Sequence, residues 1–233
     1  MKTIIILILF FGFFSFANAQ EDKIYPNTKE FQQSITPDMA IEMLKYGNQL
    51  FINNLSSNRE YHTAVQETSQ GQYPWAVVHR CMDSRVAPEI LFDLNIGDIF
   101  TTGIAGNILD VDVIGSMEYG CAVVGTKLIV VMGHTECGAV KGAIDNVVLG
   151  NITNVVQKID PAVNTVKAVT KTGDLTSKNK KFVDDVAVQN VKDVIQSIKN
   201  GSQILTDLEA SGQIKIVGAM YDVHTGEVKF LDN

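Results

Sequence analysis

The distribution of apolar and polar residues divides the chain into short apolar runs that alternate with segments of helical periodicity. Four of the runs are continuous enough to predict strands that are covered on both faces. A fifth run follows the Thr225-Gly226 turn and predicts the second strand of a hairpin. In chain order, the predicted strands are Trp75–Arg80, Gly97–Thr102, Leu128–Met132, Ile214–Met220 and Glu227–Leu231.

The segments between these runs carry helix signals. Thr36 and Pro37 supply an N-cap and a proline at the first helical position, and predict a helix that ends near Asn53. Residues 54–72 indicate a loop or a short helix. Helical spacing of apolar residues predicts further helices over 88–92, 111–124, 138–148, 155–169, 183–200 and 204–209.

Strands that alternate with helices are typical of an α/β fold whose sheet is mainly parallel. We therefore expect a single domain with a four-stranded, mostly parallel central sheet plus a C-terminal strand, flanked by helices. A helical arm is expected to precede the domain. The chain has 233 residues, of which 45% are hydrophobic, and this suits one domain of substantial size.

The first residues have the pattern of a cleaved secretory signal peptide. Lys2 precedes an apolar run from Ile4 to Phe16, and Ala17-Asn18-Ala19 supplies a small-residue cleavage site. A membrane anchor is the alternative, but the run is shorter than the roughly 20 residues of a spanning helix. We predict a signal peptide over 1–19, an N-terminal arm over 20–35, a catalytic domain over 36–233, and export to a periplasm.

The net charge of the chain argues against anionic binding partners. The formal net charge is −7 and there is no basic run. An acidic protein without a basic patch is a poor match for nucleic acid or for an anionic membrane surface. The expected partner is a small-molecule substrate.

Candidate chemistry follows two of the predicted strands. Cys81 comes after the first strand, and His134 and Cys137 come after the third. The carboxyl ends of parallel strands meet at one edge of a sheet, so these side chains can converge. Two thiolates and one imidazole suit Zn²⁺, and three protein ligands leave the fourth tetrahedral position for water. The pattern predicts one catalytic zinc ion per chain, in an enzyme of hydrolysis or hydration.

The chain contains three cysteines, so a disulfide between Cys81 and Cys137 is an alternative to metal binding. A disulfide would explain neither His134 nor the charged pair near Cys81, and we favour the metal. The third cysteine, Cys121, lies among small and apolar residues. It is expected to be a buried apolar side chain.

Asp83 and Arg85 accompany the first ligand. Asp83 is two residues from Cys81, so on an extended segment both side chains face the same side. Its carboxylate could accept a hydrogen bond from the reactive water, or could itself be the fourth ligand. Arg85 is placed to hold this carboxylate in a bidentate pair. Alternatively, Asp83 and Ser84 cap the helix near Pro88, and Arg85 is a structural ion pair.

Other titratable residues lie near the candidate ligands or in polar stretches. His79 is an alternative ligand or a proton relay, but a strand residue with a local hydrogen-bond partner is favoured. Glu136, between two ligands, is given no role. His62 and His224 lie in polar stretches and are expected to be exposed.

Several motifs together resemble the β-class carbonic anhydrases. Cys81-Met82-Asp83-Ser84-Arg85 and Gly133-His134-Thr135-Glu136-Cys137-Gly138 are similar to the two signatures of that family. The resemblance extends from about Thr36 to Leu231. It also includes Gly97–Phe100, Ala105–Asn107, Ser116–Tyr119, Gly138–Lys141, Val217–Asp222 and Thr225-Gly226.

The resemblance implies reversible hydration of CO₂ to bicarbonate and a proton, with zinc held by Cys81, His134 and Cys137. It implies an Asp83–Arg85 dyad and a homodimer or homotetramer whose N-terminal helices wrap the partner. It also implies a substrate pocket to which Gln72, Phe100, Ala105, Tyr119 and Gly138 contribute, partly across the dimer interface. A CS₂ or COS hydrolase and a non-catalytic zinc or bicarbonate binder remain alternatives on the same fold.

Two expectations concern how such a site works. Two thiolates and a neutral imidazole cancel the charge of Zn²⁺, so activity should rise with an apparent pKa above the ~7 typical of three-histidine zinc. Gly103 stands where the family commonly has an arginine that, in some members, helps to bind an inhibitory bicarbonate. We expect this protein to lack that control and to keep an open site at neutral pH.

Overall fold

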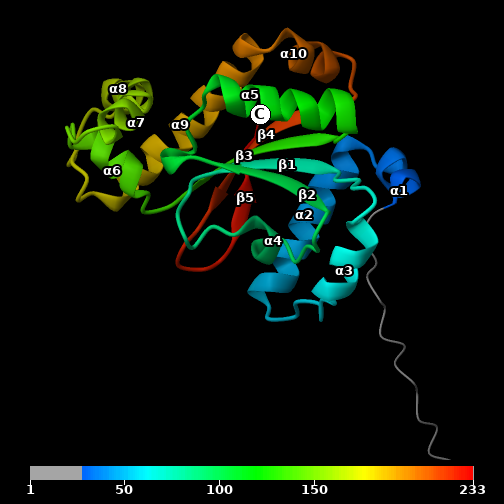
Figure 1. Cartoon of the computed structure of the whole chain (residues 1–233). Helices are drawn as coiled ribbons and strands as arrows, with labels where there is room; N and C mark the ends of the chain where they lie inside the picture. Colours follow the sequence, from blue (N-terminus) through cyan, green and yellow to red (C-terminus); the bar gives the residue numbers. More distant parts are fainter. Residues whose placement is uncertain (1–27, 233) are drawn as a thin grey trace, which may run out of the picture.

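The central element of the fold is a five-stranded sheet with the order β2-β1-β3-β4-β5 (Figure 1). The computed structural model describes residues 28–232. The first four strands are parallel and β5 is antiparallel to β4, which confirms the predicted sheet. The strands are β1 (Ala76–Arg80), β2 (Ile99–Gly103), β3 (Leu128–His134), β4 (Lys215–Tyr221) and β5 (Val228–Phe230).

The register of the strands places their carboxyl ends at one edge of the sheet. Arg80 at the end of β1 pairs with Gly103 on one side and with Met132 on the other. β3 continues two residues further, to His134, which pairs with Tyr221 of β4. The residues that follow β1 and β3 therefore start from neighbouring positions.

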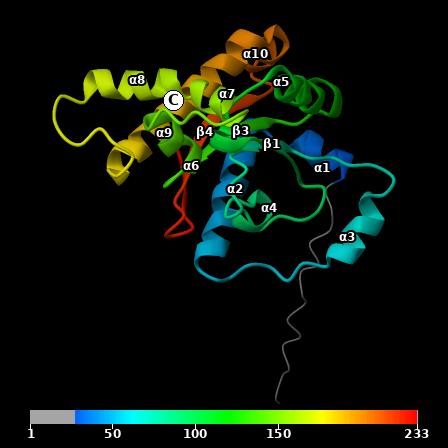
Figure 2. The same cartoon turned by 60° about the vertical axis from the view of Figure 1, so that its left-hand side comes forward.

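Helices cover both faces of the sheet, because alternate strand residues point to opposite sides. Val77 packs in the core on the side of α9, whereas Ala76 and Val78 pack on the side of α2. Figures 1 and 2 show the two layers. One face carries α5 (Val111–Glu118), α6 (Gly138–Ile144), α8 (Asp160–Val169), α9 (Lys180–Gly201) and α10 (Gln203–Ala210), and the other carries α2 (Pro37–Ile52) and α4 (Pro88–Leu91).

The single helix expected over 155–169 is wrong, because the structure divides this segment in two. α7 (Ile152–Gln157) ends before Lys158, and α8 starts at Asp160. Pro161 lies in the first turn of α8, where a residue without an N–H is tolerated, but it could not continue a helix from α7.

The helix expected over 111–124 changes its geometry at Tyr119. α5 passes into a π-helical turn, η2 (Tyr119–Val124), which ends at Gly125 with φ of 94°. A π-turn adds a residue to the helical ladder and is common beside functional sites.

The N-terminal part contains two short helices. α1 (Lys29–Ser34) lies within the predicted arm and is capped by the Thr28 side chain. α3 (Tyr61–Thr68) is the short helix allowed for in residues 54–72. The predicted signal peptide over 1–19 lies outside the described residues. Among residues 28–232, none of the helices is long and apolar enough to span a membrane.

Candidate metal centre

The three candidate ligands converge at the carboxyl edge of the sheet. Cys81 follows β1, His134 ends β3, and Cys137 is the N-cap residue of α6. One atom of each lies within 4.8 Å of the others, and all three residues are buried. The cysteines are free, so the disulfide alternative is wrong. Asp83 is not part of this three-atom group.

The orientation of His134 suits metal binding. Its Nδ1 lies 2.9 Å from the carbonyl oxygen of Thr135. A carbonyl only accepts hydrogen bonds, so Nδ1 carries the proton and Nε2 presents its lone pair. Nε2 is buried and has no hydrogen-bond partner among the described residues. A buried acceptor beside two sulfur atoms fits a metal ligand.

The pKa values of the two cysteine thiols are shifted in opposite directions. A hydrogen bond from Cys137 and another from the N–H of Gly106 lower the pKa of Cys81 in spite of its burial. Its partner, Cys137, has a raised pKa because it donates to Cys81 and is itself buried. Metal binding requires both cysteines as thiolates, so protons that the pair still holds would be released when a cation binds. This donor set fits zinc.

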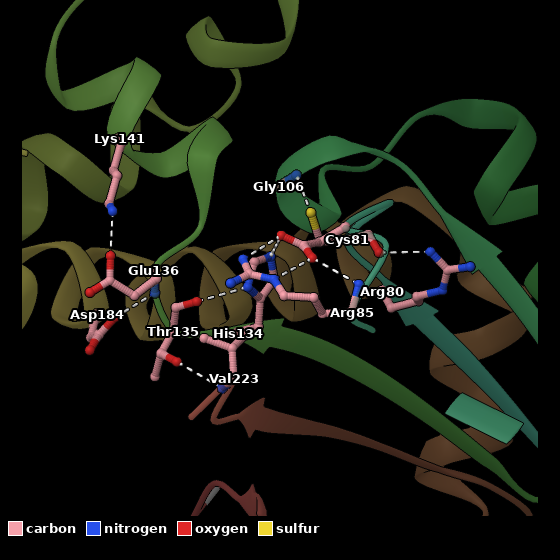
Figure 3. A network of polar contacts seen from close by, with 11 residues as sticks. Arg80, Cys81, Arg85, Gly106, His134, Thr135, Glu136, Lys141, Asp184 and Val223 are labelled. Atoms are coloured by element: carbon pink, nitrogen blue, oxygen red, sulfur yellow. Dashed lines mark hydrogen bonds and ion pairs between the residues drawn. The ribbon is translucent and has the colours of Figure 1, made fainter. Parts of the chain in front are cut away.

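Arg85, which lies next to Cys81 and His134 in Figure 3, holds the carboxylate of Asp83 beside the ligands. Arg85 donates from Nε to Oδ1 at 2.9 Å and from Nη2 to Oδ2 at 2.8 Å. These bonds hold the pKa of Asp83 well below its usual range. Oδ2 lies 3.8 Å from Nε2 of His134. The helix-cap alternative is wrong, because α4 has Ala87 as its N-cap and no capping side chain.

A tight turn supplies a backbone hydrogen bond to the first ligand. Gly106, in the short helix η1 (Ala105–Asn107), donates its N–H to Sγ of Cys81 at 3.2 Å. Its φ is 68°, and a Cβ there would lie 2.6 Å from Cδ1 of Ile159. The positive φ favours glycine, and a larger residue would also have to displace the end of the Ile159 side chain. The sequence indicated a close backbone approach here, but not its partner.

Glu136 stabilises the turn between the other two ligands. It has φ of 57°, and its N–H donates to Oδ1 of Asp184 at 3.1 Å. Its carboxylate pairs with Lys141 and with Lys180, and these bonds lower its pKa. Figure 3 shows this cluster on the side of the turn away from Cys81. The carboxylate of Glu136 is therefore engaged by the two lysines.

Two of the five predicted substrate residues lie next to the ligands. Gly138 follows Cys137 and is the first residue of α6, and no atom lies within 4 Å of the position that a Cβ would take. Ala105 begins η1, directly before Gly106. Both positions border the metal centre.

The other three lie elsewhere in the single chain. Phe100 and Tyr119 pack as a tilted aromatic pair, with ring centroids 6.3 Å apart, and both line a pocket of about 510 Å³ beside β2. Phe100 pairs with Val77, four residues before Cys81, or about 13 Å along a strand. Gln72 precedes β1 and thus lies at the opposite end of that strand from Cys81. One chain does not bring these three to its own metal centre.

His79 is a structural strand residue, as favoured from the sequence. It is fully buried, and burial lowers its pKa. Nδ1 lies 2.9 Å from Oγ1 of Thr102, and Nε2 lies 3.0 Å from the carbonyl oxygens of both Asn107 and Ile108. It contacts none of the three ligands through these atoms.

The remaining single residues agree with expectation. Cys121 is buried and accepts a hydrogen bond from Thr126, and burial raises its pKa to about 11. His62 and His224 are exposed. None of them belongs to the metal centre.

Fold and site together define a class of protein. A buried Cys–His–Cys donor set, with a carboxylate–guanidinium pair beside it, lies at the carboxyl edge of a parallel α/β sheet. This arrangement is that of a metalloenzyme that activates water.

Comparison with known proteins identifies the family. Residues 76–228 match the family model described as carbonic anhydrase. Carbonic anhydrase 2 of Mycobacterium tuberculosis is 32% identical over 84% of this chain and 94% of that protein. The β-carbonic anhydrase CafA of Aspergillus fumigatus superposes with a TM-score of 0.68 at 22% identity, over 83% of this chain and 91% of that one. A tetrameric β-carbonic anhydrase of Sordaria macrospora gives 0.63 at 23% identity, over 72% and 85%. The chain belongs to the β-class carbonic anhydrase family.

Proposed function

We propose that this protein catalyses the reversible hydration of carbon dioxide to bicarbonate and a proton, with one zinc ion per chain. The observation that carries the proposal is the buried Cys81–His134–Cys137 group with the Asp83–Arg85 pair beside it, in a chain of this family. When bound, zinc lowers the pKa of a water molecule, so that hydroxide exists near neutral pH.

The protein side chains orient the reaction. Asp83 is ionised, because Arg85 holds its pKa low, and its carboxylate can only accept hydrogen bonds. Arg85 donates to Oδ1 from both its backbone N–H and Nε, and to Oδ2 from Nη2 alone, so Oδ2 keeps a further lone pair. Asp83 can therefore accept the hydrogen of the attacking water and direct its lone pair toward the carbon of CO₂.

The same pair supports an open site at neutral pH. Arg85 holds Asp83 in a bidentate bond, so the carboxylate does not take the fourth ligand position. Gly103 also leaves this chain without the family's arginine at that position. A crystal structure at pH 7 with Asp83 bound to zinc would contradict this part of the proposal.

We also infer that a second copy of the chain completes the substrate pocket. The placement of Phe100 and Tyr119 along the edge strand β2, apart from their own chain's Cys81, supports this. The related Sordaria macrospora enzyme is tetrameric. Light scattering during size-exclusion chromatography should give a dimer or a tetramer. A fully active monomer at nanomolar concentration would exclude a shared pocket.

The localisation that we propose is periplasmic, after removal of residues 1–19. The basic start, the apolar run and the small-residue site support it. Mass spectrometry of the protein recovered from a periplasmic fraction should give a chain that begins near Gln20. A chain that retains Met1 and fractionates with the cytosol would contradict it.

The function itself is tested by stopped-flow CO₂ hydration from pH 6.5 to 9.5, with zinc per chain measured on the same sample. We expect turnover that rises with pH at one zinc per chain. A full zinc site without hydration at any pH would contradict the proposal and would direct the assay to CS₂ and COS. A profile that is flat from pH 6.5 to 9 would contradict the argument from ligand charge.

A further inference from the structure

The Gly106 turn is held from two sides by buried polar side chains. Asn190 of α9 donates from Nδ2 to the carbonyl oxygen of Gly106 at 2.8 Å. His79 of β1 lies with Nε2 at 3.0 Å from the carbonyl oxygens of Asn107 and Ile108. Gly106, whose carbonyl oxygen accepts from Asn190, also supplies the N–H that is donated to Sγ of Cys81.

The hydrogen bonds of His79 fix its tautomer. Two carbonyl oxygens face Nε2, so Nε2 carries the proton and is shared between them. Nδ1 is then the acceptor for the hydroxyl of Thr102, which is the register partner of His79 on β2. Both ring nitrogens are therefore used, and the ring has one orientation.

Asn190 is a polar residue on the buried face of α9. It is 2% exposed, on the same face as Val183 and Val194. An amide buried without a partner destabilises a fold, so such a residue needs a specific acceptor. The only acceptor that the described residues offer to its Nδ2 is Gly106.

We propose that His79 and Asn190 are positioning residues of the metal centre, which hold the Gly106 turn so that its N–H is donated to the sulfur of Cys81. The proposal rests on the zinc site of the proposed function. A hydrogen bond to a thiolate withdraws electron density from the sulfur, and such supporting bonds adjust the strength of a metal ligand. The pair thereby acts on the metal without contacting it.

The test uses Co²⁺-substituted and zinc-loaded protein. Asn190→Leu and His79→Phe remove the two clamps with side chains of similar size, and Thr102→Val removes only the hydroxyl that orients His79. His79→Gln can keep a donor near the place of Nε2. The readouts are the sulfur-to-cobalt charge-transfer band and the zinc affinity in competition with a chelator.

A matched control is available on the other face of the sheet. Asn48 is also 2% exposed, and it donates to the carbonyl oxygens of Leu91 and Gly226, away from the ligands. Asn48→Leu should lower the unfolding temperature and leave the cobalt band and the zinc affinity unchanged. Any effect of general destabilisation is thus measured separately.

We expect Asn190→Leu and His79→Phe to shift the charge-transfer band to lower energy and to weaken zinc binding by roughly tenfold or more. Thr102→Val should give a smaller change in the same direction, and His79→Gln should recover part of the effect. Equal bands and affinities in wild type, Asn190→Leu and Thr102→Val would overturn the proposal. Neither readout needs turnover, so the positioning role is tested even if the protein binds zinc and does not hydrate CO₂.

Discussion

Arg80 lies over Gly103, its register partner on the neighbouring strand. A Cβ built on Gly103 would lie 3.1 Å from Nη1 of Arg80, and the same Nη1 donates to the carbonyl oxygen of Cys81 at 2.8 Å. The guanidinium of one strand thus fills the space that a side chain of the other would need. The glycine at this position and the arginine opposite it form one packing unit.

This relationship predicts that an arginine cannot simply be introduced at position 103. Gly103→Arg should lower the free energy of unfolding by about 1–2 kcal/mol, because Arg80 must move and loses its bond to Cys81. The double variant Gly103→Arg/Arg80→Gly has room for the new side chain. Its loss in free energy of unfolding, measured by urea denaturation, should be smaller than the sum of the losses in the two single variants. Additive effects would show that the two positions do not share their space.

Arg85 should control the direction of the Asp83 carboxylate rather than its charge. Removal of Arg85 raises the pKa of Asp83 toward its ordinary value, which is still well below 7, so Asp83 stays ionised in the assay. We expect Arg85→Ala to lower kcat/KM by at least about tenfold, while zinc stays at one per chain. The kcat/KM of Arg85→Lys should lie between those of wild type and Arg85→Ala, because lysine keeps the charge but cannot form the bidentate pair.

The control for this variant is Lys181→Ala, which removes an exposed ion pair with Asp185 on α9 and should leave kcat/KM unchanged. Stopped-flow hydration and metal analysis on the same samples give both quantities. Unchanged kcat/KM in Arg85→Ala would remove Arg85 from the mechanism. Loss of zinc in that variant would instead assign it a role in binding the metal.

Substitution of a ligand cysteine should reduce the zinc content, whereas substitution of Cys121 should not. Cys137→Ser is expected to bring zinc well below one per chain and to lower the unfolding temperature, since a bound metal stabilises the folded state. Cys121→Ala should retain a full complement of zinc, because this thiol is engaged with Thr126 away from the ligands. Atomic absorption and thermal unfolding test both. Zinc loss of the same size in both variants would contradict the assignment of ligands.

Sequence reasoning succeeded where the signal is local. The structure confirms three such predictions: the helix capped by Thr36, the apolar strands, and the convergence of the two ligand motifs. The first two depend on neighbouring residues, and the third depends on the shared edge of a parallel sheet. The division at Pro161 had a local signal too, because a proline cannot continue a helix. Apolar spacing outweighed that signal in the prediction.

The missed contacts depend on tertiary packing. The bond from Asn190 to Gly106 joins residues 84 positions apart. Its only trace in the sequence is a polar residue on the apolar face of a helix, and this does not identify the partner. That contact needs the packing of elements, which local patterns do not encode. The separation of Gln72 from Cys81, by contrast, had a local signal, because the predicted strand Trp75–Arg80 lies between them.

Asp98 gives the stability of the fold a specific dependence on pH. This carboxyl lies before β2 and is 7% exposed, and burial raises its pKa from 3.8 to about 6, in spite of a hydrogen bond from Asn95. The folded state therefore binds the proton more tightly than the unfolded state. The resulting stability is fully present below pH 3.8 and is lost as the pH rises through about 6.

Asp98→Asn should remove this dependence, because an amide keeps the acceptor for Asn95 and does not ionise. At pH 7 the variant should be more stable than wild type by about 1–3 kcal/mol, and near pH 4 the two should agree. Urea denaturation of both proteins at each pH gives the difference in their free energy of unfolding. Contributions that the two proteins share, including those of the metal ligands, cancel in this difference. Asp185→Asn controls for the loss of an exposed carboxylate. A difference between wild type and Asp98→Asn that is the same at pH 4 and pH 7 would show that Asp98 has an ordinary pKa in the folded protein.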